Sequence, residues 1–245
     1  MSHQKKISKA VICCGGKATR FAPISRTVPK EMFPIGARPV IHYIVQELID
    51  AGITDILMLI GTDRGSLQHY MDCFADSVNV YYRRVPVARG PADNIWHAKS
   101  FAKGQHFITA YCDDVFFEGN PTRELIEEFF TSGRPALTVT EVAKQNAHQY
   151  GIFDGRQIVE KPAKYIGNLA AVGRYLLPPN IFGLIEQEMR NTREGSPEIC
   201  FVKQLNKIPD LRAVKTAAKR FDTGTPQGFF EVNKYFTENN GCLGF

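Results

Sequence analysis

The sequence contains no hydrophobic run that approaches the roughly 20 apolar residues needed to cross a bilayer. The apolar stretch after the polar residues 1–9 is too short for the core of a signal peptide, so we expect no targeting signal and a cytoplasmic protein. Polybasic tracts are also absent. The 30 Lys and Arg residues are spread along the chain against 25 Asp and Glu, which gives a net charge of +5. This mild excess argues against nucleic-acid or membrane partners and suits a small anionic substrate.

Cysteine motifs are missing as well. Six cysteines are scattered along the chain, and no two of them form a C-x-x-C pair. They lie at positions 13, 14, 73, 112, 200 and 242. Cys13 and Cys14 are neighbours whose side chains point to opposite faces if they lie in a strand. The pattern predicts neither a zinc site nor a disulfide framework, and favours reduced thiols that are buried as small hydrophobic groups.

Internal repeats and low-complexity tracts are absent, and 245 residues are enough for one α/β domain that needs no disulfides. Hydrophobic runs of strand length alternate with amphipathic stretches of helix length. We expect strands over 9–14, 55–60, 78–83, 106–111, 136–141, 170–176 and 213–221. We expect helices over 39–51, 67–74, 93–101, 122–131, 181–189 and 226–236, and a ribbon over 150–161 that turns at residues 154–155. This alternation predicts a mostly parallel mixed sheet flanked by helices.

The segment from Val11 to Pro34 is the most informative part of the sequence. A strand ends there in two glycines within CGGKATRF (14–21), and a second basic motif, VPKEM (28–32), follows. Glycines let the backbone pass close to a ligand, and exposed N–H groups in such a loop bind phosphate oxygens. Arg20 and Lys30 add positive charge. The segment is neither a Walker A motif nor a G-x-G-x-x-G motif, and a plain turn with two unrelated basic residues is the alternative.

Acidic residues follow two later strands. Asp113 and Asp114 belong to YCDD (111–114) at the end of an apolar strand, which is where open α/β sheets bind ligands. Asp222 lies in FDTGT (221–225). Paired carboxylates are suitable ligands for a magnesium ion that also contacts phosphates. An aspartate that only caps the next turn is the alternative. Similarly, Glu160 and Lys161 in EKP form either a substrate contact or a solvated ion pair at the end of a strand.

The order and spacing of these motifs resemble the sugar-1-phosphate nucleotidyltransferases, whose signature is G-x-G-T-R, x-x-P and then P-K. In detail the chain resembles the bacterial UTP:glucose-1-phosphate uridylyltransferases. The similarity continues through residues 30–35, 39–45, 51–56, 150–152, 158–162, 172–182 and 220–225. The resemblance implies a Rossmann-like nucleotidyltransferase fold in one domain, 1–245. Its nucleotide-binding half spans about residues 8–115, and its sugar-phosphate half, with the second metal ligand, spans about residues 116–237.

The resemblance also implies a role for each motif. The catalytic cations are Arg20, Lys30 and Lys161. The nucleotide-binding residues are Gly15, Gly16, Lys17, Ala18, Thr19, Gly90, Ala92 and Cys112. The sugar-binding residues are Glu160, Asn168 and Gly173, and Asp113 and Asp222 bind Mg²⁺, with Asp114 as a weaker candidate ligand.

The implied reaction joins a nucleoside triphosphate to a sugar 1-phosphate with release of pyrophosphate, and UTP with glucose 1-phosphate is the expected pair. Ala18 replaces the second glycine of the signature, and the Gln that would pair with uracil is missing before the Gly90–Ala92 segment. A nucleotidyltransferase that uses another base or another phosphorylated acceptor is therefore an alternative. Region 61–78 is also shorter than in typical members of the family. A metal-dependent glycosyltransferase and an inactive sugar-nucleotide-binding regulator are the alternatives from other classes. The oligomeric state is left open, and a homo-oligomer is compatible with the sequence.

Overall fold

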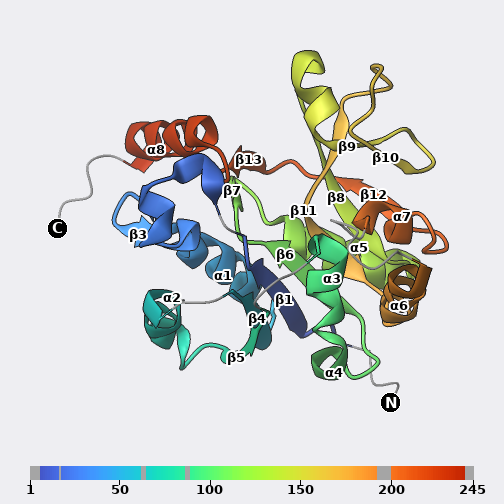
Figure 1. Ribbon diagram of the computed structural model, residues 1–245, viewed down its shortest axis with the longest axis horizontal. Helices are drawn as coiled ribbons and strands as arrows, with labels where there is room; N and C mark the ends of the chain where they lie inside the picture. The colour runs from blue at the N-terminus through green and yellow to red at the C-terminus, as the bar shows by residue number, and fades with distance from the viewer. Residues whose placement is uncertain (1–5, 17, 62–64, 86–88, 192–199, 241–245) are drawn as a thin grey trace.

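The core of the molecule is a nine-stranded mixed sheet with helices on both faces (Figure 1). The computed structural model describes residues 6–16, 18–61, 65–85, 89–191 and 200–240. Four neighbouring strands run parallel in the order β5-β4-β1-β6. They are β5 Asn79–Arg84, β4 Asp55–Ile60, β1 Lys9–Cys14 and β6 Phe107–Tyr111. The first strand of the chain therefore lies in the middle of the parallel part, and the α/β fold predicted from the sequence is confirmed.

The other strands join the sheet through β11 Leu169–Leu177, which runs antiparallel to β6. Its further neighbours are β8 Ala136–Glu141 and β9 Gly151–Phe153, while β10 Ile158–Glu160 pairs with β9 and β12 Arg212–Lys215 pairs with β8. Two short ribbons consist of β7 Asp114–Phe117 with β13 Lys219–Asp222, and of β2 Pro34–Ile35 with β3 Arg38–Pro39. Only two residues separate β6 from β7, so the first ribbon begins directly at the end of β6.

Two hydrophobic cores lie on opposite faces of the sheet. One face packs against α1 Val40–Asp50, α2 Gly65–Met71, α5 Pro121–Ser132 and α8 Pro226–Asn240. The other packs against α3 Pro91–Trp96, α4 Lys99–Ala102, α6 Ile181–Asn191 and α7 Phe201–Leu205. Alternation along β1 sends Cys14 into the first core and Cys13 toward the second, as the sequence predicts. Among the described helices, none is long and apolar enough to span a membrane.

Short 3₁₀ helices occupy the connections that carry the basic motifs. They are η1 Thr19–Phe21, η2 Ile24–Arg26, η3 Lys30–Met32, η4 Asp72–Phe74 and η5 Lys144–Gln149. Two predicted turns are also present. Helix α1 stops at Gly52, which takes a φ of 88°, and the hairpin between β9 and β10 turns at Gly155, with a φ of 98°. In that hairpin Asp154 Oδ1 accepts hydrogen bonds from the N–H groups of Arg156 and Gln157.

Three expected elements are divided in the structure. The helix expected over 67–74 is α2 followed by η4. The helix expected over 93–101 is α3 followed by α4, because Ala98 N–H donates to Ile95 O, three residues back, and tightens the chain between them. The strand expected over 213–221 is β12 and β13, which belong to different sheets. Between these strands, Ala218 N–H donates to Thr216 Oγ1 in a turn that redirects the chain toward β7.

Candidate active site

The candidate site lies where β1 and β6 end side by side. These parallel strands pair in register, with Cys13 opposite Tyr111. Gly15 and Gly16 follow β1, and Asp113 follows β6 two residues after Tyr111. The carboxyl ends of parallel strands meet at one edge of a sheet. The glycine loop and the first candidate metal ligand therefore emerge at the same place.

Lys30 links this loop to Asp113. Its ammonium Nζ lies 2.5 Å from Asp113 Oδ2 and 3.6 Å from the position that a Cβ on Gly16 would occupy. The Lys30 side chain is only 12% exposed. Burial opposes its charge, but the neighbouring carboxylates of Asp113 and Glu31 favour it and raise the pKa of Lys30. A fixed ammonium is thus held between the glycine loop and a carboxylate.

Asp113 and Asp222 converge across Gly224. A Cβ built on Gly224 would lie 2.7 Å from Asp113 Oδ2 and 3.1 Å from Asp222 Oδ1, so no side chain fits between the two carboxylates. Thr223 fixes the approach, because its N–H and its hydroxyl donate to the backbone carbonyl of Asp113 at 2.8 and 2.9 Å. The structure therefore brings together two acids that are separated by more than a hundred residues in the sequence.

Asp114, the weaker metal candidate, points the other way. Its carboxylate is buried and accepts hydrogen bonds from Arg220 Nε at 2.6 Å and from Gly173 N–H at 2.9 Å. A Cβ on Gly173 would collide with this carboxylate, so glycine is required there. Asp114 is consequently engaged in holding β7 against β13 and β11, while Asp113 and Asp222 stay about 30% exposed.

The charges at this edge suit a divalent cation. Three carboxylates, Asp113, Asp114 and Asp222, face two cations, Lys30 and Arg220. Burial raises the pKa of Asp222 and the neighbouring Asp114 raises it further, while Arg220 opposes them. Hard oxygen donors with an excess of negative charge are what Mg²⁺ prefers. The donor set of Asp113 and Asp222 thus fits the ion that the family resemblance implies.

A buried ion pair holds the backbone in place at the end of β6. Arg174 on β11 donates from Nε and Nη2 to the two carboxylate oxygens of Glu47 on α1, at 2.9 and 2.7 Å. The same guanidinium donates to the carbonyls of Asp114 and Tyr111, on either side of Asp113. Arg174 is completely buried. Its paired geometry therefore fixes the backbone from which the Asp113 side chain projects.

A cavity of about 350 Å³ lies at the residues predicted to bind the sugar phosphate. Glu160 and Lys161 line it at the end of β10, across from Tyr175 on β11 and Pro91 at the start of α3. Lys161 has a φ of 43°, and its Nζ lies 3.6 Å from Glu160 Oε1. Both side chains are well exposed, so they are open to a ligand.

Two residues that are predicted to contact the sugar lie outside the lining of this cavity. These residues are Asn168 and Gly173. The carbonyl of Asn168 accepts a hydrogen bond from Val142 N–H, and Gly173 serves Asp114 as described above. Their assignment to the sugar remains a prediction.

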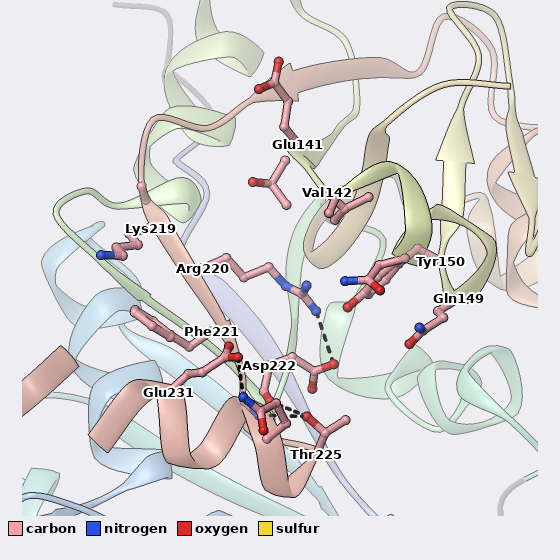
Figure 2. A pocket seen from close by; sticks show the side chains of 16 residues that line it. Glu141, Val142, Gln149, Tyr150, Lys219, Arg220, Phe221, Asp222, Thr225 and Glu231 are labelled. Atoms are coloured by element: carbon pink, nitrogen blue, oxygen red, sulfur yellow. Dashed lines mark hydrogen bonds and ion pairs between the residues drawn. The ribbon is translucent and has the colours of Figure 1, made fainter. Parts of the chain in front are cut away.

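A second cavity, of about 670 Å³, adjoins the first and shares Gln149 and Tyr150 with it. Figure 2 shows Arg220 and Asp222 reaching into this space from β13, with Tyr150 and Gln149 on the other side. The Arg220 guanidinium lies 5.2 Å from the centre of the Tyr150 ring and 3.9 Å from Asp222 Oδ2. The two cavities therefore meet at Tyr150.

Ala18, at the second glycine position of the signature, has a glycine-like backbone conformation. Ala18 has a φ of 48°, the left-handed conformation that glycine adopts most easily, and it precedes η1. Thr19 and Arg20 in η1 are exposed. Gly90, with a φ of 89°, directly precedes α3, and Ala92 is buried within the helix. Lys17 lies outside the described residues.

Cys112, predicted to contact the nucleotide, turns its side chain inward, where Sγ donates to Glu31 Oε1 at 3.3 Å. Asn94 on α3 also lies at the glycine loop, although no sequence motif marks it. Asn94 is 8% exposed, and its Nδ2 lies 3.6 Å from the Cβ position of Gly15. Its Oδ1 is buried without a hydrogen-bond partner among the described residues. The only sequence signal was its place four residues after Gly90.

Comparisons with known proteins place the chain in a family. A model of the nucleotidyl transferase family matches residues 9–239. A UTP–glucose-1-phosphate uridylyltransferase of Bacillus subtilis is 28% identical, over 95% of this chain and 91% of the relative. UTP–glucose-1-phosphate uridylyltransferase 2 of Staphylococcus saprophyticus is 30% identical, over 93% of this chain and 91% of the relative.

Among solved structures, the UTP-bound UGPase from Acinetobacter baumannii superposes with a TM-score of 0.82 and 26% identity, over 97% of this chain and 96% of that chain. The match spans both the parallel part of the sheet and the strands around β11. The chain therefore belongs to the nucleotidyl transferase family and is a sugar nucleotidyltransferase similar to the bacterial UTP–glucose-1-phosphate uridylyltransferases.

Proposed function

We propose that the enzyme joins UTP and glucose 1-phosphate to form UDP-glucose and pyrophosphate. One observation carries the proposal: the Lys30–Asp113–Asp222 group lies beside a glycine loop, and the cavity next to it presents a second lysine, Lys161. A triphosphate site and a sugar-phosphate site on either side of one metal site are what nucleotidyl transfer requires. The names of the similar proteins support uridine and glucose as the substrates.

The reaction needs no covalent intermediate. An oxygen of the sugar phosphate attacks the α-phosphorus of the triphosphate in line, the bond between the α- and β-phosphates breaks, and pyrophosphate leaves with the electron pair. The attacking phosphate is already ionised, so no general base is required. Catalysis then consists of positioning and of neutralising the charge on the phosphate oxygens.

Each residue has a part in that process. The N–H groups around Gly15 and Gly16 and the Arg20 guanidinium bind the triphosphate, and Lys30 faces the α-phosphate. Lys161 binds the sugar phosphate, and Glu160 accepts hydrogen bonds from sugar hydroxyls.

Asp113 and Asp222 would hold Mg²⁺, which supplies positive charge to the phosphate oxygens when it is bound. Hydrogen bonds within the protein hold both residues in place. The Thr223 hydroxyl donates to the Asp113 carbonyl, and Gly224 N–H donates to Asp222 Oδ1 at 3.0 Å. The nucleotide-binding half, about 8–115, and the sugar-phosphate half, about 116–237, each contribute one of the two acids.

Pyrophosphate release tests this proposal. The purified chain is incubated with Mg²⁺ and a panel of nucleoside triphosphates, each with glucose 1-phosphate, with other sugar 1-phosphates, or alone. We expect release only when both substrates are present, and the highest kcat/KM for UTP with glucose 1-phosphate. Highest activity with another pair would correct the substrate assignment. No release with any pair, together with transfer of glucose from UDP-glucose, would show a glycosyltransferase instead.

A further inference from the structure

Three buried side chains from separate elements form a cluster beneath the active-site edge. Cys14 ends β1, Glu31 lies in η3, and Cys112 follows β6. Their relative exposures are 0%, 0% and 3%. The two sulfurs and a carboxylate oxygen all lie within 4.8 Å of one another, and Cys112 Sγ donates to Glu31 Oε1 at 3.3 Å. The cluster is thus compact and closed off from bulk solvent.

Strand register explains why the cysteines meet. Cys13 pairs with Tyr111 across the parallel strands β1 and β6, so the next residues, Cys14 and Cys112, lie side by side. Both belong to the same hydrophobic core, whereas Cys13 faces the opposite one. The absence of a C-x-x-C pair predicted no zinc site from these cysteines. The register nevertheless brings two of them together from positions 98 residues apart.

The donor set differs in kind from that of Asp113 and Asp222. Two thiols and one carboxylate suit a soft or borderline cation such as Zn²⁺, whereas Mg²⁺ prefers oxygen ligands alone. Cys14 and Cys112 are buried in an apolar core, where a thiol keeps its proton at neutral pH. A cation must therefore displace two protons.

The charge balance allows this exchange next to Lys30. A divalent cation that replaces two thiol protons adds two positive charges as the two thiolates add two negative ones, so the net charge of the cluster does not change. The ion pair between Lys30 and Asp113 then faces the same net charge with or without the metal.

We propose that Cys14, Glu31 and Cys112 bind one thiophilic divalent cation of the Zn²⁺ class, separate from the Mg²⁺ site. Two metal–sulfur bonds and at least one metal–oxygen bond form, two S–H bonds break, and both protons pass to solvent without any change in oxidation state. The metal connects the end of β1, η3 and the end of β6. These three elements carry the glycine loop, Lys30 and Asp113, so metal binding would stiffen the catalytic edge.

Cadmium titration of the full-length, metal-free protein tests the proposal independently of its activity. Excess Mg²⁺ is present to occupy the oxygen ligands, and the thiolate-to-Cd²⁺ charge-transfer absorbance is followed in the ultraviolet. We expect one tight equivalent per chain in the wild type and loss of that equivalent in Cys14→Ala and in Cys112→Ala. Cys13→Ala and Cys73→Ser are the matched controls and should keep it. Glu31→Gln should keep the thiolate band but bind Cd²⁺ about tenfold or more weakly.

Two results would overturn the site: no charge-transfer band in the wild type, or an unchanged band in both Cys14→Ala and Cys112→Ala. If those variants fail to fold, as circular dichroism would show, the visible spectrum of the Co²⁺-loaded wild type decides. Intense bands with sulfur-to-cobalt charge transfer support a thiolate site. Only the weak bands of six-coordinate cobalt contradict it. Neither readout depends on nucleotidyl transfer, so the proposed function and this site can fail separately.

Discussion

The two lysines of the candidate site differ in how firmly the protein holds them. Lys30 is 12% exposed and is fixed at 2.5 Å from Asp113, above the buried pair of Glu47 and Arg174. Lys161 is 65% exposed, and its nearest carboxylate is the exposed Glu160 at 3.6 Å. Under the proposed function, the triphosphate side is thus organised before substrate arrives, whereas the sugar-phosphate side is ordered by its ligand. We therefore expect Lys30 to contribute mainly to turnover and Lys161 mainly to substrate binding.

The largest effect is expected where the buried scaffold is broken. Glu47→Ala leaves the fully buried Arg174 without its carboxylate partner, and we expect a loss of about 3–5 kcal/mol in the free energy of unfolding. Urea denaturation measures this change. Glu238→Ala, which removes the partner of Lys234 in an exposed pair, is the control and should cost less than about 1 kcal/mol. Equal losses in the two variants would mean that the catalytic edge is not built on this pair.

Removal of the fixed ammonium should affect turnover most. Lys30→Ala should lower kcat at least about a hundredfold, because a preorganised charge is lost, while circular dichroism should still show the folded protein. Steady-state pyrophosphate release gives kcat. Lys99→Ala, whose ammonium pairs with Glu186 between α4 and α6, is the control and should leave kcat unchanged. Wild-type turnover in Lys30→Ala would rule out the assigned role.

The exposed lysine should act mainly on binding. Lys161→Ala should raise the KM for glucose 1-phosphate about tenfold with a smaller change in kcat, in keeping with one charge-assisted hydrogen bond. The KM for UTP should change little. Lys207→Ala, which removes another partly exposed lysine, serves as the matched control. A loss of kcat as large as that of Lys30→Ala would contradict the contrast between the two sides.

The smallest effect concerns the base. We propose that the buried amide of Asn94, next to Gly15, contacts the nucleobase, so Asn94→Ala should lower the preference for UTP over CTP about tenfold, or about 1.4 kcal/mol. The ratio of kcat/KM values measures it. Asn239→Ala on the exposed face of α8 is the control. An unchanged ratio would place base selection elsewhere.

Sequence patterns predicted most of the fold because the signals are local. The apolar spacing of α1 and its stop at Gly52 marked that helix, and Asp154 with Gly155 marked the hairpin. The change of sheet between β12 and β13 was missed, because an apolar run does not show which partner strand it pairs with.

Family motifs marked Lys30, Asp113 and Asp222, which lie together in the structure. Contacts that depend on strand register, such as Cys14 beside Cys112, have no spacing signal in the sequence. The place of Asn94 beside Gly15 depends on how α3 packs at the end of β1, and the sequence does not encode this in any local pattern.

The central claim is that Asp113 and Asp222 hold the metal that nucleotidyl transfer requires. The most direct measurement is the Mg²⁺ dependence of pyrophosphate release from UTP with glucose 1-phosphate, in the wild type, Asp113→Asn and Asp222→Asn. We predict no release without a divalent cation, and a clearly higher Mg²⁺ requirement in each variant because an amide is a weaker ligand than a carboxylate. An unchanged Mg²⁺ dependence in both variants, or a wild-type rate that needs no divalent cation, would contradict the account.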